Sequence, residues 1–211
     1  MLEAAPLADA LRELAADGHA VFFDRYAYRS IALRHVLPPK VPAPLFAAES
    51  GVLGTRFVPP NRPIASLYLA WEAETAHREG NQAHYQAVEK AGVDFSGVAP
   101  PDEVALIGVR IRARALLDVR SAGVRDRVGT TEDELRSRWK TVTDAPTQRL
   151  GEAVYRAGAF EGMIYQSAQN PCGSCLVLFP DRHGPGSSVE FKSKAPGVPD
   201  ARLAGPPALP A

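Results

Sequence analysis

Hydrophobic and polar positions alternate most regularly near the middle of the chain. Valine, isoleucine and alanine occupy positions 109, 111, 113 and 115, and arginine fills the three positions between them. A period of two is typical of a β-strand that has one buried face and one solvated face. The sequence therefore predicts a one-sided strand here, with Arg110, Arg112 and Arg114 on its solvated face.

Helical periodicity and end signals predict four helices. They are expected at about 6–17, 72–90, 131–139 and 146–157. Thr131 begins a capping-box sequence, Pro146 suits the first turn of a helix, and Gly158 suits the position after its last turn. Gly80 is expected to interrupt the second of these helices.

Short apolar or aromatic runs predict the other strands, at 21–31, 67–70, 163–166 and 176–179. Strands and helices are mixed without strict alternation. This pattern favours an α+β fold, with a mostly antiparallel sheet and flanking helices, over a doubly wound parallel fold. We expect one domain at residues 1–190 and an irregular Pro/Gly-rich tail at 191–211.

Composition and charge give no argument for several classes of partner. The 211 residues include 24 Lys plus Arg and 24 Asp plus Glu, so no net charge attracts nucleic acid or an anionic membrane. The arginines at 110–127 are interrupted by acids and lack interleaved aromatics, so we interpret them as a solvated sheet face. Without a long apolar run or a secretion signal, the expected location is cytoplasmic, with no membrane or nucleic-acid partner.

Familiar catalytic and metal motifs do not explain the chain. It has no Gly-x-Gly-x-x-Gly, P-loop, Gly-x-Ser-x-Gly or His-Glu-x-x-His sequence. Cys172 and Cys175 have redox or half-zinc spacing, but we interpret them as small packed thiols. His77 and His84 share one helical face without further identifiable ligands, so no metal site is predicted.

The strongest candidate chemistry lies between Gly54 and Glu79, where a loop, a strand and a helix follow one another. This stretch holds Arg56, Tyr68 and Glu79, while Arg29 lies on an earlier strand and Ser167 ends a later one. A planar guanidinium suits a phosphate group, and a carboxylate suits a developing positive charge. From the residues alone, two interpretations stay open. These side chains could form a site for a small anionic ligand, or each could be an ordinary solvated or core residue.

Four ordered blocks resemble the RES-domain family, over about residues 28–179. They are Tyr28-Arg29-Ser30, Gly54-Thr55-Arg56-Phe57, Leu67-Tyr68-Leu69-Ala70 leading to Glu79, and Gly162 to Ser167 before Leu176-Val177-Leu178-Phe179. Two features depart from the family pattern. Thr55 stands where the family usually has the second glycine of Gly-Gly-Arg, and an insertion is expected at about 80–103.

The resemblance implies a bacterial toxin with an ADP-ribosyltransferase-like fold that degrades NAD by hydrolysis or phosphorolysis. Its partners would be NAD, water or inorganic phosphate, and a Xre-type antitoxin, with no cofactor beyond NAD as substrate. It further implies that Glu79 stabilises the oxocarbenium ion and that Tyr68 stacks on the nicotinamide. Arg29 and Arg56 would hold the diphosphate, and Ser167 would bind phosphate or orient the attacking group.

Two other functions stay open at this point. The same NAD site could serve a mono-ADP-ribosyltransferase that modifies a protein, because the choice of acceptor depends on geometry that the sequence does not show. A non-catalytic interaction module is the third hypothesis, and the altered loop around Arg56 is the feature that keeps it in view.

Overall fold

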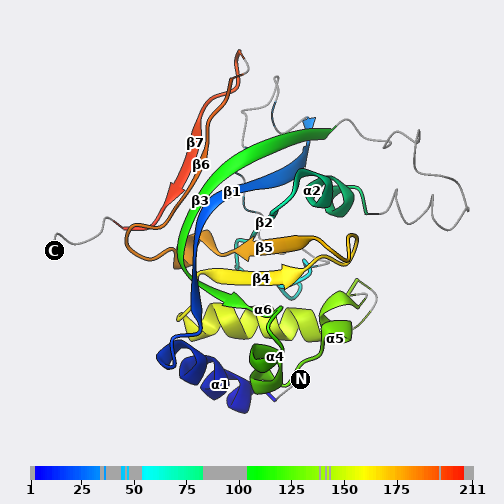
Figure 1. Ribbon diagram of the computed structural model, residues 1–211, viewed down its shortest axis with the longest axis vertical. Coiled ribbons are helices and arrows are strands. Elements are labelled where there is room, and N and C mark those ends of the chain that lie inside the picture. The colour runs from blue at the N-terminus through cyan, green and yellow to red at the C-terminus, as the bar shows by residue number, and fades with distance from the viewer. Residues whose placement is uncertain are drawn as a thin grey trace, which may run out of the picture.

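A computed structural model describes residues 3–33, 36, 44–45, 47, 54–82, 104–137, 139–140, 142, 144–194 and 196–206. Within these residues a sheet forms the centre of the molecule, with strand order β1-β2-β5-β4-β3-β6-β7 (Figure 1). The strands are β1 (Ala20–Ala32), β2 (Leu67–Ala70), β3 (Val104–Asp118), β4 (Gly162–Gln166), β5 (Ser174–Leu178), β6 (Ser188–Phe191) and β7 (Ala201–Ala204).

The long strands β1 and β3 close part of this sheet into a ring. β1 pairs with β2 on one edge and with β3 on the other, so β1, β2, β5, β4 and β3 form a continuous circuit of pairings. In the described sheet β3 and β4 are parallel and the other pairs are antiparallel. The mixed α+β class and the largely antiparallel sheet are therefore confirmed.

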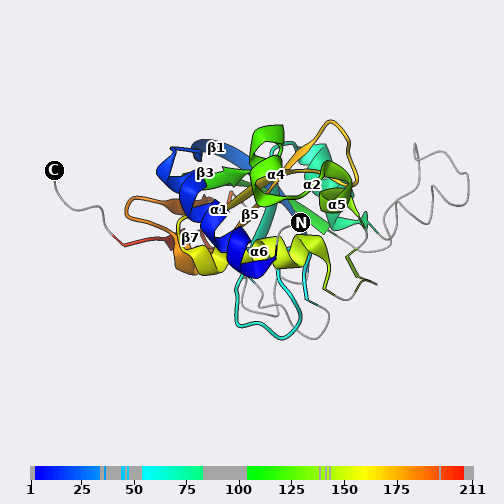
Figure 2. The same cartoon turned by 90° about the horizontal axis from the view of Figure 1, so that it is seen from below.

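The α-helices lie in two groups. The described helices are α1 (Ala4–Ala16), α2 (Ala73–Gly80), α4 (Ala122–Val128), α5 (Glu132–Arg136), α6 (Pro146–Ala157) and the short 3-10 helix η2 (Pro180–Arg182). Figures 1 and 2 show α1, α4, α5 and α6 together on one side of β4, while α2 lies inside the arch that β1 and β3 make. This arrangement leaves α2 beside the strands that hold the predicted site residues.

The middle strands have no solvated face, because their side chains alternate between two apolar cores. Leu67, Ile164 and Leu176 enter the core beneath β1 and β3. Met163 and Val177 enter the other core, against α1 and α6. Burial on both faces explains why these strands have nearly continuous apolar sequences, whereas β3 buries Val109, Ile111 and Ala113 but exposes the arginines that alternate with them.

The prediction of an irregular tail at 191–211 is wrong for the part of it that forms strand β7. This strand pairs with β6 from Phe191↔Ala201 to Ser188↔Ala204. Its Ala-Arg-Leu-Ala sequence has little strand propensity of its own, so the pairing with β6 determines its structure. The helix expected at 72–90 corresponds to α2, which ends at Gly80. The insertion expected at about 80–103 lies outside the described residues from position 83 onward.

Helix α6 makes a very close contact with the loop at 54–58. A Cβ atom added to Gly151 would lie 1.9 Å from the carbonyl oxygen of Phe57, so residue 151 must be glycine for this approach. The side-chain amide of Gln148 also donates to the Thr55 carbonyl at 3.0 Å. The helix thereby holds the loop that carries Arg56.

We expect Gly151→Ala to lower the free energy of unfolding by about 1–3 kcal/mol, because the methyl group must displace backbone. Urea denaturation followed by circular dichroism measures this change. Gly123→Ala on α4 is the matched control, since its Cβ meets nothing within 4 Å. Equal denaturation midpoints for the two variants would contradict the proposed close contact.

Candidate functional site

A cavity of about 410 Å³ lies where α2, β1, β2 and the 54–58 loop meet. Its volume is within the range of pockets that bind small molecules. Four of the residues predicted from the sequence line it, namely Arg29, Arg56, Tyr68 and Glu79. The structure therefore brings together side chains from a strand, a loop, a second strand and a helix, whereas Ser167 lies outside the cavity wall.

Tyr68 joins β2 to the loop before it. Its hydroxyl lies 2.8 Å from Thr55 Oγ1 and accepts a hydrogen bond from the Phe57 amide at 3.1 Å. Burial raises the pKa of Tyr68, so the phenol is neutral at ordinary pH. The ring is thus fixed at the cavity wall by its own hydroxyl group.

The two arginines reach the cavity from different elements. Arg29 on β1 donates to the Pro44 carbonyl at 3.2 Å, and Arg56 donates to the Leu135 carbonyl at 3.0 Å. Burial lowers the pKa of Arg29 to about 10, which still leaves it positively charged at neutral pH. Because a guanidinium has five N–H donors, each arginine keeps donors available for an anionic ligand.

Glu79 lies near the end of α2 with one carboxylate oxygen held firmly. Its Oε1 accepts hydrogen bonds from Ser167 Oγ at 2.6 Å, the Ala168 amide at 3.0 Å and the Gln169 amide at 3.3 Å. None of the hydrogen bonds among the described residues goes to Oε2. The side chain lines the cavity, so Oε2 is the oxygen available to a ligand there.

Ser167 supports Glu79 in this structure. It was expected to contact a ligand, but it lies behind Glu79 and not in the cavity wall. It is completely buried, and its Oγ accepts hydrogen bonds from the amides of Gln169 at 3.1 Å and Asn170 at 2.9 Å. The same Oγ donates to Glu79. Its hydroxyl therefore organises the turn after β4 and orients the carboxylate.

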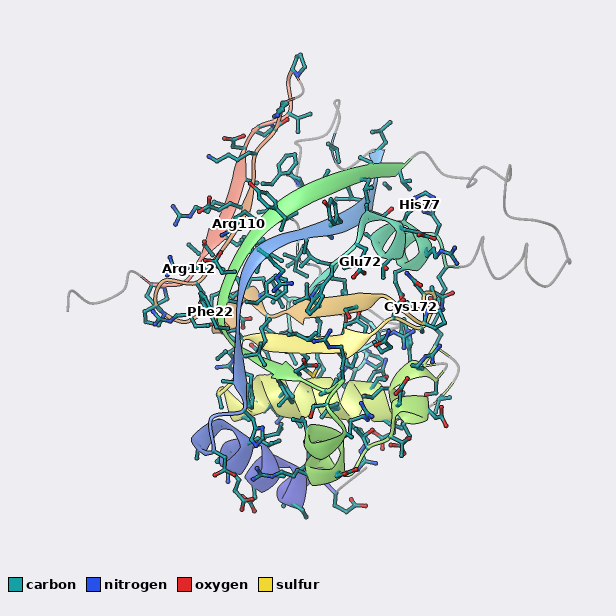
Figure 3. The ribbon with its side chains drawn as sticks, viewed as in Figure 1. Phe22, Glu72, His77, Arg110, Arg112 and Cys172 are labelled. Carbon is teal, nitrogen blue, oxygen red and sulfur yellow. The ribbon has the colours of Figure 1, made fainter. Side chains whose placement is uncertain are left out.

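A chain of polar contacts ties this turn to α2. Asn170 Nδ2 donates to Thr75 Oγ1 at 2.8 Å, and Thr75 Oγ1 donates to Glu72 Oε2 at 2.9 Å. The Ser174 amide donates to the same Glu72 oxygen at 3.3 Å. Figure 3 shows Glu72 at the start of α2, and these bonds fix the helix against the β4–β5 hairpin.

The inner wall of the cavity contains Tyr165 and Cys175. Burial raises the pKa of both groups, so they are a neutral phenol and a neutral thiol at ordinary pH. Cys175 is buried and Cys172 is exposed, and both are free. Across the described residues no group of three or more histidine, cysteine, aspartate or glutamate side chains could hold a metal ion, and His84 lies outside them.

Sequence reasoning missed part of the cavity wall. Gln82, Trp139 and Lys140 also line the cavity. Trp139 and Lys140 follow α5, and the hydrogen bond from Arg56 to Leu135 brings the end of that helix to the loop. No spacing in the sequence signals this approach, because it depends on a contact between distant segments.

The fold and the site together define a class: a single α+β domain whose sheet closes on itself beside a cavity with one carboxylate, three tyrosines and two guanidinium groups. The chain belongs to the RES domain family, whose sequence profile matches residues 27–202. This match extends the resemblance seen in the sequence through β6 and into β7.

A comparison with solved structures supports the same fold. A chain in the crystal structure of the M. tuberculosis MbcT–MbcA toxin–antitoxin complex aligns with a TM-score of 0.60 and 18% identity. The alignment covers 95% of this chain and 93% of that one. A search of curated proteins finds no match. In the part of the chain that the structure describes, no helix is long and apolar enough to cross a membrane.

We expect Ser167→Ala to lower the free energy of unfolding by about 1–3 kcal/mol, because the amides of Gln169 and Asn170 lose their acceptor. Thermal or urea denaturation of the purified protein measures the effect. Ser137→Ala removes an exposed serine hydroxyl and serves as the control, with a change of about 0.5 kcal/mol or less. A Ser167→Ala protein as stable as this control would show that the buried turn does not depend on the hydroxyl.

Proposed function

We propose that this RES-domain chain cleaves the nicotinamide–ribose bond of NAD, by hydrolysis or phosphorolysis, as the toxin of a toxin–antitoxin pair. One observation carries the proposal. Glu79 has one oxygen held by three donors and the other available to a cavity that also contains Tyr68 and two arginines. Family membership supports the same assignment.

The chemistry of NAD explains why one carboxylate is sufficient. The nicotinamide ring is cationic before the bond breaks and leaves as a neutral molecule. Ordinary glycosidases need a second carboxyl group to protonate the departing oxygen. Here no proton has to be supplied, so the main requirement is to stabilise the positive charge that develops on the ribose.

Glu79 meets this requirement through Oε2. A fixed carboxylate beside the ribose hydroxyls stabilises the oxocarbenium ion without having to reorganise during the reaction. Ser167 acts as a positioning residue, because its hydroxyl holds Oε1 at 2.6 Å. This role replaces the direct phosphate or water contact that the sequence suggested for Ser167.

The remaining side chains position the substrate. Tyr68 offers an aromatic face to the nicotinamide, and its hydrogen-bonded hydroxyl keeps the ring in place. Arg29 and Arg56 supply N–H donors to the diphosphate, which guanidinium groups bind well. The proposed arrangement uses each of the four predicted residues that line the cavity.

The toxin role rests on the family and on the likeness to the M. tuberculosis complex. Continuous NAD cleavage would deplete a metabolite that the cell requires, so an inhibitory partner is needed until the toxin acts. A Xre-type antitoxin is the proposed partner. We also propose that the fold of this chain is related to that of the ADP-ribosyltransferases.

We expect Glu79→Gln to reduce the rate of NAD consumption by about 100-fold or more, because it removes the charge that stabilises the transition state. Glutamine keeps an oxygen that can accept the hydrogen bonds to Oε1. Glu74→Gln on the same helix is the control, since Glu74 is exposed and pairs with Arg78. A folded Glu79→Gln protein with wild-type turnover would refute the mechanism.

Product analysis identifies the acceptor. The reaction is run with and without inorganic phosphate, and free ADP-ribose or its phosphate is separated by chromatography. Labelled NAD in a cell lysate adds the third case, in which label on a protein band identifies a mono-ADP-ribosyltransferase. Binding of NAD without consumption would instead support a non-catalytic module.

We expect Arg29→Gln to raise the Michaelis constant for NAD by about tenfold, because it removes a charge-assisted contact to the diphosphate. Arg156→Gln on α6 is an exposed control that should leave the constant unchanged. Arg56→Gln tests the second guanidinium, with its unfolding measured in parallel because Arg56 also binds the Leu135 carbonyl. Unchanged Michaelis constants for Arg29→Gln and Arg56→Gln would contradict their role with the diphosphate.

A further inference from the structure

The solvated sides of β1 and β3 form a continuous surface on which aromatic rings and arginines lie together. We call it the outer face and define it by Phe22 and Tyr26 on β1 and by Leu106, Arg110, Arg112 and Arg114 on β3. Tyr26 is directly opposite Arg110 in the pairing of the two strands. Figure 3 shows Phe22, Arg110 and Arg112 along the curve of this strand pair.

The outer face exposes large apolar side chains that the fold does not use. Phe22 is 55% exposed, Tyr26 is 62% exposed and Leu106 is 46% exposed. In the described part of the chain, Val142 is the one other large hydrophobic residue with comparable exposure. Single exposed apolar residues are ordinary, but three on one strand pair indicate an interaction surface.

The same face carries more positive than negative charge. Arg110 forms an ion pair with Asp24, the carboxylate that β1 contributes beside it. The guanidinium of Arg112 lies 5.9 Å from the Phe22 ring centre, and Arg114 donates to the Pro185 carbonyl at 3.4 Å. Neither Arg112 nor Arg114 forms an ion pair with a carboxylate in the described residues. The chain as a whole has no net charge, so this excess is local.

The composition of the face favours a protein as its occupant. Aromatic residues and arginine are enriched in the central parts of protein interfaces, whereas lysine is depleted, and the outer face has no lysine. Its unpaired arginines call for carboxylates on that protein. A second copy of the chain would place the same three arginines opposite each other. Nucleic acid is disfavoured by Asp24 and by the neutral charge of the chain.

The face also leads to the candidate active site. Tyr28 lies two residues after Tyr26 on the same side of β1, and it lines the cavity. Two residues along a strand span about 7 Å. A protein segment that covers Tyr26 and continues along β1 therefore reaches the cavity wall at Tyr28.

We infer that the outer face docks an acidic, partly aromatic or apolar segment of a protein partner, and that this partner lies beside the entrance to the cavity. The docking surface itself is inferred from exposure and charge. Identification of the partner as the inhibitory antitoxin rests on the proposed function.

The test measures binding of a fluorescein-labelled glutamate–tyrosine copolymer to the full chain by fluorescence anisotropy. Polyglutamate and labelled oligothymidylate are measured in parallel. We expect the copolymer to bind more tightly than either, and Phe22→Ser/Tyr26→Ser or Arg112→Gln/Arg114→Gln to weaken it by about tenfold. Arg156→Gln on α6 is the control for a lost surface arginine and should keep wild-type binding.

Three outcomes would overturn the inference. They are the absence of copolymer binding, binding that the face variants do not change, and tighter binding of oligothymidylate that the face variants abolish, which would assign the face to nucleic acid. Sedimentation of the unliganded chain adds a fourth, a dimer that the face variants dissociate. NAD consumption is measured on the same samples, so an inactive protein that still binds the copolymer would reject the proposed reaction and retain the docking surface.

Discussion

The hydrogen bonds that hold Glu79 Oε1 connect the parts of the structure on which the candidate site depends. Ser167, the partner at 2.6 Å, lies 88 positions away in the sequence, so the contact joins α2 to the turn between β4 and β5. Hydrogen bonds to a charged group contribute about 1.5–3 kcal/mol each when well formed. They restrict the carboxylate to one orientation and thereby determine which oxygen meets a ligand. The buried position of Ser167 follows from this task.

Hydrogen bonds also hold the loop around Arg56 in place, although its sequence departs from the family pattern. Thr55, which replaces a glycine, places its hydroxyl 2.8 Å from the Tyr68 hydroxyl. The Thr55 amide also donates to the Val58 carbonyl at 2.9 Å, which closes the turn. The unusual residue therefore strengthens the connection between the loop and the tyrosine. This contact weakens the argument that the altered loop marks a site that has lost its function.

Local signals determined which elements the sequence could predict. The strand at 67–70 and the helix at 146–157 have the predicted bounds, because the apolar run, Pro146 and the left-handed Gly158 mark their ends. Helix α4 and strand β7 were missed because each is short and depends on distant segments. The same dependence on distant segments explains which site residues the sequence could place and which it could not. The order of blocks located Arg29, Arg56, Tyr68 and Glu79, but the position of Ser167 and the approach of Trp139 required the tertiary fold.

Charge orders the proposed substrate within the cavity. NAD has a cationic nicotinamide at one end and an anionic diphosphate near its middle, and the cavity wall contains both the carboxylate of Glu79 and the guanidinium groups of Arg29 and Arg56. Opposite charges attract strongly where water is partly excluded. The proposed complex therefore has the nicotinamide end beside Glu79 and the diphosphate beside the arginines. In the proposed reaction, the positive charge moves from the ring to the ribose as the bond breaks, and Glu79 would stabilise it there as well. The neutral nicotinamide would lose its attraction to the carboxylate at the same step, so the proposed reaction would itself promote release of the first product.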